Sequence, residues 1–168
     1  AGDFNSIGGT AGLSGIARLH NNGTWDSSFV ASVNGSIYSM QCRVDGKIVI
    51  AGSFSQVNSA NRIGYAVLNN NGTLADDYSS LSASSAVYGI ALQNDGKIVL
   101  GGPFAAIGSA SREYLARLTP DIAAVNTLTT DDNGSLIEWT RSGSAPEIEN
   151  AEFRMRIPPA TTFSTLLR

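Results

Sequence analysis

The chain has 168 residues, of which 42 % are hydrophobic and only 15 % are charged, and its formal net charge is −3. The clustered Lys and Arg that nucleic-acid binding or docking on an anionic membrane require are missing, so both classes are excluded. No apolar run approaches the roughly 18 residues that span a bilayer, and one Cys cannot form an internal disulfide.

A unit of about fifty residues recurs along the chain. Residues 37–54 and 87–104 share Tyr, Asp-Gly-Lys-Ile-Val, Gly and Phe at an offset of 50, and residues 1–4 match the end of both segments. Periods of 20 to 50 residues indicate propellers, solenoids or arrays, in which one unit cannot bury its apolar face alone.

Each unit begins with alternating residues, as in Tyr38, Met40 and Cys42, which predict a strand with one face of large side chains. Asp45-Gly46 and Asp95-Gly96 then predict two-residue hairpin turns. Residues 47–50 and 97–100 are nearly continuously apolar, which is typical of a strand covered on both faces.

The rest of the unit supplies two more strands. Gly52 and Gly102 predict a close approach to a neighbouring unit, and Phe4, Phe54 and Phe104 anchor the segment. Third strands are expected over residues 15–19, 64–68 and 114–118. Asn-Gly turns and outer strands over residues 24–29 and 73–78 follow. About four short antiparallel strands make a propeller blade, whereas solenoid units usually take about 20 to 30 residues.

After Leu118 the repeat decays, because Thr119-Pro120-Asp121 replaces the Asn-Gly turn. Residues 136–139 and 152–156 are predicted strands, and Pro158-Pro159 ends the second of them. This tail either completes a blade or begins a separate β-sandwich.

The units resemble the delta-60 repeat family in residues 87–104, in Ile16-Ala17-Arg18-Leu19 and in residues 22–29, and the resemblance covers residues 1 to about 121. The tail from Ile137 to Glu147 is similar to the segment that follows the last repeat in some members. The resemblance implies a β-propeller in large bacterial secreted or surface proteins, sometimes in phage particles, and no known enzyme activity. Pro103 and Ala75 depart from the pattern.

We therefore expect an all-β chain of blade-like four-stranded repeats, a partial β-propeller. Residues 1–121 form the repeat region, with a partial blade at 1–36 and blades at 37–86 and 87–121. Residues 122–168 form a non-repeat β segment. Propellers have four to eight blades, so the chain is expected to be a piece of a longer protein, or other chains supply the missing blades.

Catalytic, cofactor and metal residues are all expected to be absent. Cys42 is interpreted as core filler and His20 as an exposed turn residue, and no Gly-x-Ser-x-Gly element accompanies them. Asp76, Asp77, Asp131 and Asp132 lack EF-hand spacing, although Asp131 and Asp132 are the best metal candidates. Glu147, Glu149 and Glu152 could form a paired acid/base site. The preferred interpretation is that they lie on an exposed strand face.

Other polar and aromatic residues also carry two readings. Asn22, Asn34, Asn71 and Asn133 lie in sequons, and the turn interpretation is preferred to glycosylation. Arg62 and Arg112 are predicted to donate to carbonyls of an adjacent blade. Trp25 is expected to pack, since it aligns with Leu74, whereas Trp139 has no repeat partner.

The leading functional expectation is a non-catalytic scaffold or recognition module of a larger extracellular or surface protein. Its partners would be other blades or chains that complete the propeller, and a protein or glycan ligand. One alternative is a carbohydrate-binding or carbohydrate-cleaving propeller with Trp139, Glu147 and Glu149 in its cleft. The other is a structural subunit of a phage particle or surface appendage.

Overall fold

The computed structural model describes residues 1–78, 81–120, 124–131, 136–148, 151–155 and 164–167. Over these residues the chain forms sixteen strands and no helix, and the paired strands are antiparallel. The prediction of an all-β chain built from small blade-like sheets is confirmed. The described part of the chain has no helix with the length and apolarity that a bilayer crossing requires.

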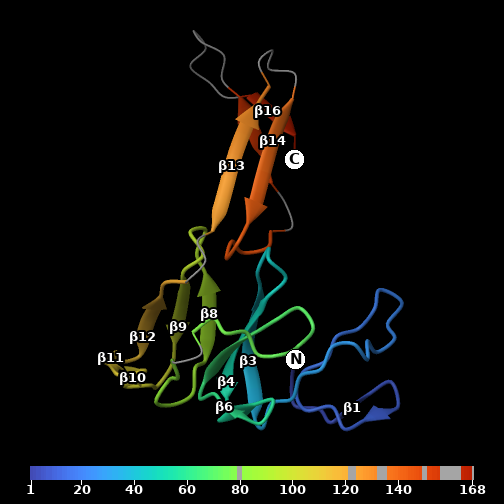
Figure 1. Ribbon diagram of the computed structural model, residues 1–168, viewed down its shortest axis with the longest axis vertical. Helices are drawn as coiled ribbons and strands as arrows, with labels where there is room; N and C mark the ends of the chain where they lie inside the picture. Colours follow the sequence, from blue (N-terminus) through green and yellow to red (C-terminus); the bar gives the residue numbers. More distant parts are fainter. Residues whose placement is uncertain (79–80, 121–123, 132–135, 149–150, 156–163, 168) are drawn as a thin grey trace.

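The second unit forms the larger of the two three-stranded sheets, which we call blade 2 (Figure 1). Its strands are β3 (Ser36–Cys42), β4 (Ile48–Ser53) and β7 (Tyr65–Leu68), in the order β3-β4-β7. A short hairpin of β5 (Gln56–Val57) and β6 (Ala60–Asn61) follows β4. The expected outer strand is reduced to one bridge between Leu68 and Leu74, so the sheet has three strands and not four.

The third unit repeats this arrangement as blade 3. Its strands are β8 (Gly89–Leu92), β9 (Ile98–Gly101) and β12 (Leu115–Leu118), in the order β8-β9-β12. The corresponding hairpin consists of β10 (Ala106–Ile107) and β11 (Ala110–Ser111). Strand β8 lies beside β3 (Figure 1), and the Ile90 amide donates to the Ser39 hydroxyl at 3.3 Å.

The first unit forms only the small hairpin of β1 (Ser6–Ile7) and β2 (Thr10–Ala11). The strand predicted over residues 15–19 makes no ladder, and Leu19 pairs with Trp25 through a single bridge. In blades 2 and 3 the equivalent strand pairs with β4 or β9. Among the described residues, the first unit has no strand equivalent to β4 or β9. The backbone N–H and C=O groups of residues 15–19 therefore form no strand ladder.

The turns after the first strands differ from the prediction in length. The Arg43 amide donates to the Lys47 carbonyl, the Gly46 amide donates to the Arg43 carbonyl, and Gly46 has a φ of 79°. The same pair of hydrogen bonds recurs at Gln93–Lys97, His20–Thr24 and Asn69–Thr73. The predicted two-residue loop is therefore wrong. Each loop has three residues, and its last, a Gly, adopts the left-handed conformation.

Blades 2 and 3 bury one sheet face against each other. The alternate residues of β4 and β7 that point toward blade 3 form what we call face A: Val49, Ala51, Tyr65 and Val67. They pack on the opposite face of blade 3, called face B: Ile98, Leu100, Phe104, Ile107, Ala116 and Leu118. Burying each Val, Leu, Ile or Phe contributes about 1.5–3 kcal/mol, so this contact stabilises the pair strongly.

The first unit packs on blade 2 in the same way. Ile16, Phe29 and Val33 contact face B of blade 2, which consists of Ile50, Phe54, Val57, Ala66 and Leu68. Ile16 and Phe29 occupy the repeat positions of Tyr65 and Tyr78, which lie in the contact between blades 2 and 3. The same positions therefore build both contacts.

The first strands do not bury their large side chains as predicted. Tyr38, Met40 and Tyr88 are exposed, and Cys42 is only half-buried. Face A and face B are built mostly by β4, β7, β9 and β12. The first strands thus stand at one edge of each sheet, where the rings of Tyr38 and Tyr88 meet edge to face at 5.7 Å between centroids.

Gly52 and Gly102 make the predicted close approaches. A Cβ on Gly52 would overlap the Ser36 carbonyl oxygen, and one on Gly102 would overlap that of Ala86. The approaching chain is the start of the first strand of the same sheet, and not another blade as predicted. The Gly52 carbonyl in addition accepts a hydrogen bond from the Val87 amide at 3.1 Å, which links blade 2 to blade 3.

The tail forms two hairpins, β13 (Val125–Thr130) with β14 (Ile137–Ser142) and β15 (Phe153–Met155) with β16 (Ser164–Leu167). The β13–β14 hairpin projects away from the blades (Figure 1). Its link to blade 2 is a short stretch in which the Val44 amide donates to the Ala145 carbonyl at 2.8 Å and the Glu147 amide donates to the Cys42 carbonyl at 3.2 Å. The tail thus contacts the turn end of blade 2.

Candidate functional site

Arg18 links the first unit to blade 2 as a clamp. Its Nη1 donates to the Asn70 carbonyl at 2.5 Å and to Asn70 Oδ1 at 2.8 Å, while its Nε donates to Asp26 at 2.8 Å. The guanidinium also lies 5.2 Å from the centre of the Phe29 ring. Hydrogen bonds from the hydroxyl and amide of Ser28, together with Arg18, lower the pKa of Asp26 to about 2. The clamp is therefore charged over the ordinary pH range.

An ion cluster around the buried Arg43 side chain joins blade 2 to its own outer segment. The Arg43 side chain is 1 % exposed and donates to Asp45 at 2.7 Å and to Asp77 at 2.8 Å. Lys47 donates to Asp77 at 2.6 Å. Burial opposes ionisation of Asp77, but the hydrogen bonds from Lys47 and Arg43 keep its pKa below the ordinary value. Sequence reasoning missed this cluster. One signal was available: Arg43, just before the Asp45-Gly46 turn, is charged, whereas its repeat equivalent in blade 3 is the neutral Gln93.

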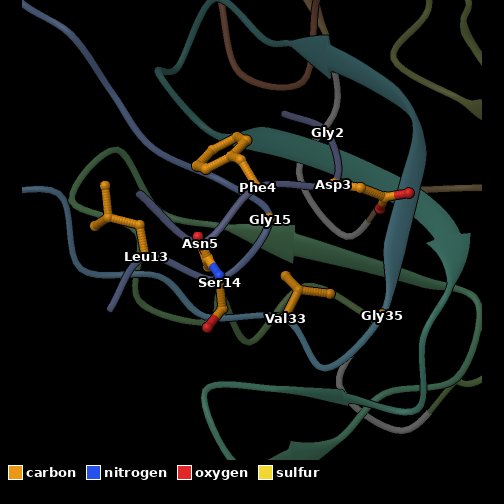
Figure 2. Close-up of a pocket in the computed structure, with 9 residues that line it drawn as sticks. All are labelled: Gly2, Asp3, Phe4, Asn5, Leu13, Ser14, Gly15, Val33 and Gly35. Carbon is orange, nitrogen blue, oxygen red and sulfur yellow. The ribbon is translucent and has the colours of Figure 1, made fainter. Parts of the chain in front are cut away.

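An open pocket of about 440 Å³ lies on the first unit. Figure 2 shows that three separate stretches line it: residues 2–5, residues 13–15 and, across from them, Val33 and Gly35. In blade 2 the equivalent glycine, Gly52, is covered by the Ser36 backbone, whereas Gly2 meets only the Phe4 ring at 4.0 Å. The pocket therefore marks the place that the first strand occupies in the other two units.

A second pocket, of about 600 Å³, lies between β3 and the tail. It is lined by Gln41, Cys42, Val44, Arg141, Glu147 and Ile148. Burial, and then the charge of Glu147, raises the pKa of the Cys42 thiol. A raised pKa disfavours the thiolate that a nucleophile needs. Arg141 donates to the Pro146 carbonyl and lies 5.1 Å from the Trp139 ring, so this predicted aromatic borders the pocket region.

The remaining predicted residues lie apart from one another. His20 is exposed, and its Nε2 lies 3.9 Å from Asp26, a carboxylate already bound by Arg18. Asp131 accepts from the Leu136 amide at 2.8 Å, whereas Asp132, Asn133 and Glu149 fall outside the described residues. Within the described ranges, no three His, Cys, Asp or Glu side chains gather as a metal site would require.

The sequon residues Asn22, Asn34 and Asn71 and the paired arginines have hydrogen-bond partners within the chain. Asn22 and Asn71 each accept from the amide and hydroxyl of the Thr two residues later, and Asn34 accepts from the amides of Ser55 and Gln56. The contacts at Asn22 and Asn71 agree with the turn interpretation, whereas the partners of Asn34 lie 21 and 22 residues further along the chain. Arg62 and Arg112 each donate at 2.7 Å to the carbonyl of the preceding residue. The prediction that they reach an adjacent blade is wrong.

Comparison with known proteins identifies the repeat. No curated protein and no solved structure matches the chain. The model of one family, described as "Domain of unknown function (DUF5122) beta-propeller", matches residues 1–29, 45–74 and 93–121, together a little over half of the chain. These three segments are equivalent parts of the three units and include the last strand of each sheet described above. The chain therefore belongs to this β-propeller family.

Proposed function

We propose that the chain is a non-catalytic scaffold or recognition module. The observation that carries the proposal is the repeated packing of equivalent faces between successive units, which uses most of the large apolar side chains. Such packing holds the strands rigid, and the loops between them are then free to vary and to bind. The raised pKa of Cys42 and the engagement of Asp26 by Arg18 favour a module without a reactive centre.

The setting is part of the same proposal. The repeat motif resembles the delta-60 family, which implies a large bacterial secreted or surface protein. We infer an extracellular or surface-associated location, with further blades from the same polypeptide or from other chains as the first partners. Neither nucleic acid nor a membrane span belongs to this function.

Protease treatment of intact source cells tests the setting. Mass spectrometry of the released material is expected to recover peptides of residues 1–121 without a cytosolic marker protein. The intact source protein is expected to be heavier than the 17.5 kDa of this chain. Recovery of the peptides only after lysis would contradict the location, and a parent of 17.5 kDa would contradict a larger protein.

Carbohydrate binding is a second candidate, favoured by the exposed ring pair of Tyr38 and Tyr88. A glycan array compares the wild type with Tyr88→Ala, and with Tyr114→Ala as the control. Tyr114 is similarly exposed but lies directly before β12, which β9 separates from β8. Binding that Tyr88→Ala alone abolishes supports this candidate. Hydrolysis that is lost on Glu147→Gln would make it an enzyme and end the non-catalytic proposal.

A further inference from the structure

The contact of the first unit with blade 2 and the contact of blade 2 with blade 3 share one backbone framework. The Val33 amide donates to the Ser14 carbonyl at 3.2 Å, as the Ala83 amide does to the Ile63 carbonyl at 3.0 Å. Two more hydrogen bonds recur, Asn34 to Gln56 and Asn58 to Ser32 in the first contact, and Ser84 to Ala106 and Gly108 to Ser82 in the second. The two contacts can therefore be compared side chain by side chain.

A small polar pocket of about 150 Å³ lies in the first of these contacts. It is lined by Ser14, Ser32, Val33, Asn34, Gln56 and Ser59. In the second contact the equivalent positions are more apolar or larger, with Ile63 for Ser14, Ala106 for Gln56 and, beside them, Leu81 for Ala31. There a Cβ on Gly108 would lie 2.8 Å from Leu81 Cδ2. The polar lining therefore comes from side chains of the first contact and not from the packing that both contacts share.

Most polar groups of this pocket are available to a ligand. In the part of the chain that the structure describes, the side chains of Ser14, Ser32, Gln56 and Ser59 form no hydrogen bond within the protein. Asn34 differs, because its Oδ1 accepts from two backbone amides and its Nδ2 donates to a serine hydroxyl at 2.9 Å. One side of the pocket is thus fixed, and the other polar groups face solvent or a bound molecule.

The backbone of Ser59 is a second, independent sign of a binding site. Its φ of 64° lies in the left-handed region, which disfavours residues other than glycine. The first unit has Gly9 at this position, with a φ of 84°, whereas Ser109 of blade 3 is not in this region. Strained residues of this kind are concentrated at sites that bind ligands. A glycine would suit the conformation better, so the serine hydroxyl is the feature that needs an explanation.

We propose that this pocket binds a neutral, hydroxyl-rich ligand of the size of one sugar unit. Serine hydroxyls and the Gln56 amide both donate and accept hydrogen bonds, as sugar hydroxyls do. None of the six lining side chains carries a charge to pair with an anion or a cation. Drug-sized ligands need pockets of about 300–1,000 Å³, so a single ring fits better than a chain of sugars. This binding rests on the proposed function, because it supplies the ligand class of a recognition module. The pocket shares no residue with the Tyr38–Tyr88 ring pair.

Two-dimensional NMR titration of the whole chain with glucose, galactose, mannose and N-acetylglucosamine tests the site. Saturable shifts are expected at the amides of Ser14, Ser32 and Gln56, with a dissociation constant on the order of 1 mM for so small a ligand. The amides of Ser82 and Ala106, at the equivalent positions of the second contact, should stay unchanged. No saturable shift with any of the four sugars, or equal shifts at both contacts, would overturn the proposal.

Two variants test which side chains hold the ligand. Gln56→Ala installs the residue that blade 3 carries and should raise the dissociation constant about threefold to tenfold, as for a lost hydrogen bond. Gln41→Ala is its control, because Gln41 is exposed and lies outside this pocket. Ser59→Gly should weaken binding without lowering the unfolding temperature, since glycine suits the positive φ, and Ser109→Gly should leave binding unchanged. Wild-type affinity in both pocket variants overturns the proposal.

A free sugar and the terminal residue of a glycan share this chemistry, and a glycan array separates them. Retention on the array together with the NMR shifts identifies a glycan terminus, and shifts alone identify a free sugar. The failure of this site is distinct from failure of the proposed function. A chain that binds none of the sugars loses the site and keeps the scaffold role. Hydrolysis of a bound sugar would end the non-catalytic function and leave the site in place.

Discussion

Blades 2 and 3 place the same repeat positions in opposite environments. In β4 both faces are covered, and Val49, Ile50 and Ala51 are fully buried. In β9 only Ile98 and Leu100 are fully buried, while Val99 between them is half-buried. The two strands have almost the same sequence, so the number of neighbouring blades, and not the strand itself, decides which side chains form the core.

The largest difference is expected from Tyr65 and Leu115, which hold the same repeat position on the corresponding faces of blades 2 and 3, here called face A in both. Tyr65→Ala should lower the free energy of unfolding by about 3 kcal/mol or more, because it empties a filled position between two blades. Leu115→Ala should change it by less than about 0.5 kcal/mol, because the side chain already meets solvent. Urea unfolding measures both. Equal losses would show that face A of blade 3 is covered in solution.

Arg43→Gln tests whether the turn ends of the two blades are interchangeable, because Gln93 holds the equivalent position in blade 3. The change removes the buried Arg43 and leaves the part-buried Asp77 with Lys47 as its remaining cation, and a loss of about 3 kcal/mol is expected. Lys97→Gln is the control, since the Lys97–Asp95 pair is exposed and such pairs contribute about 0–1 kcal/mol. A neutral Arg43→Gln would mean that the cluster adds nothing to stability.

Gly52 and Gly2 hold the same repeat position, but only Gly52 is covered by a neighbouring backbone segment. Gly52→Ala should cost about 1–3 kcal/mol, because its methyl group forces the Ser36 backbone to move. Gly2→Ala should be close to neutral, because only the Phe4 ring lies within 4.0 Å. Thermal unfolding of the two variants gives the comparison. A large loss at Gly2 would show that a strand covers that site in solution.

The smallest effect is expected from Asp26, whose repeat equivalent in blade 2 is Ala75. Its pKa is lowered from 3.8 to about 2 in the folded chain, so its stabilising contribution is complete above about pH 4 and is lost as the pH falls toward 2. Asp26→Asn should therefore be less stable than the wild type at neutral pH, and this difference should shrink in acid. Urea midpoints at both pH values measure it, and a constant difference would rule out ionisation as the cause.

Local patterns in the sequence predicted much of the fold. Ile48 and Ile98 lie in the expected central strands, and Gly46 and Gly96 in the expected turns. The pattern failed where the structure depends on neighbours. The alternation of Tyr38 and Met40 has the period of a strand but does not say whether a blade covers it. Similarly, residues 15–19 have the sequence of a strand but lack a ladder partner among the described residues.

The candidate sites were less predictable than the strands. The contact of Arg43 with Asp77 joins residues 34 positions apart, and that of Arg18 with Asn70 joins residues 52 apart. Neither pair has a fixed spacing that a motif could contain, since the repeat replaces Arg18 by Val67 and Arg43 by Gln93. Only the packing of one unit on the next brings these groups together.

Blade 2 has both of its faces covered, and this determines the order in which the units unfold locally. Each unit contacts only its neighbours, so local unfolding starts at the outer units and reaches the middle one last. The amides of β4 and β7 should then exchange with deuterium more slowly than those of β9 and β12, although the strands are alike in sequence. In such an array, resistance to opening depends on a strand's place in the row.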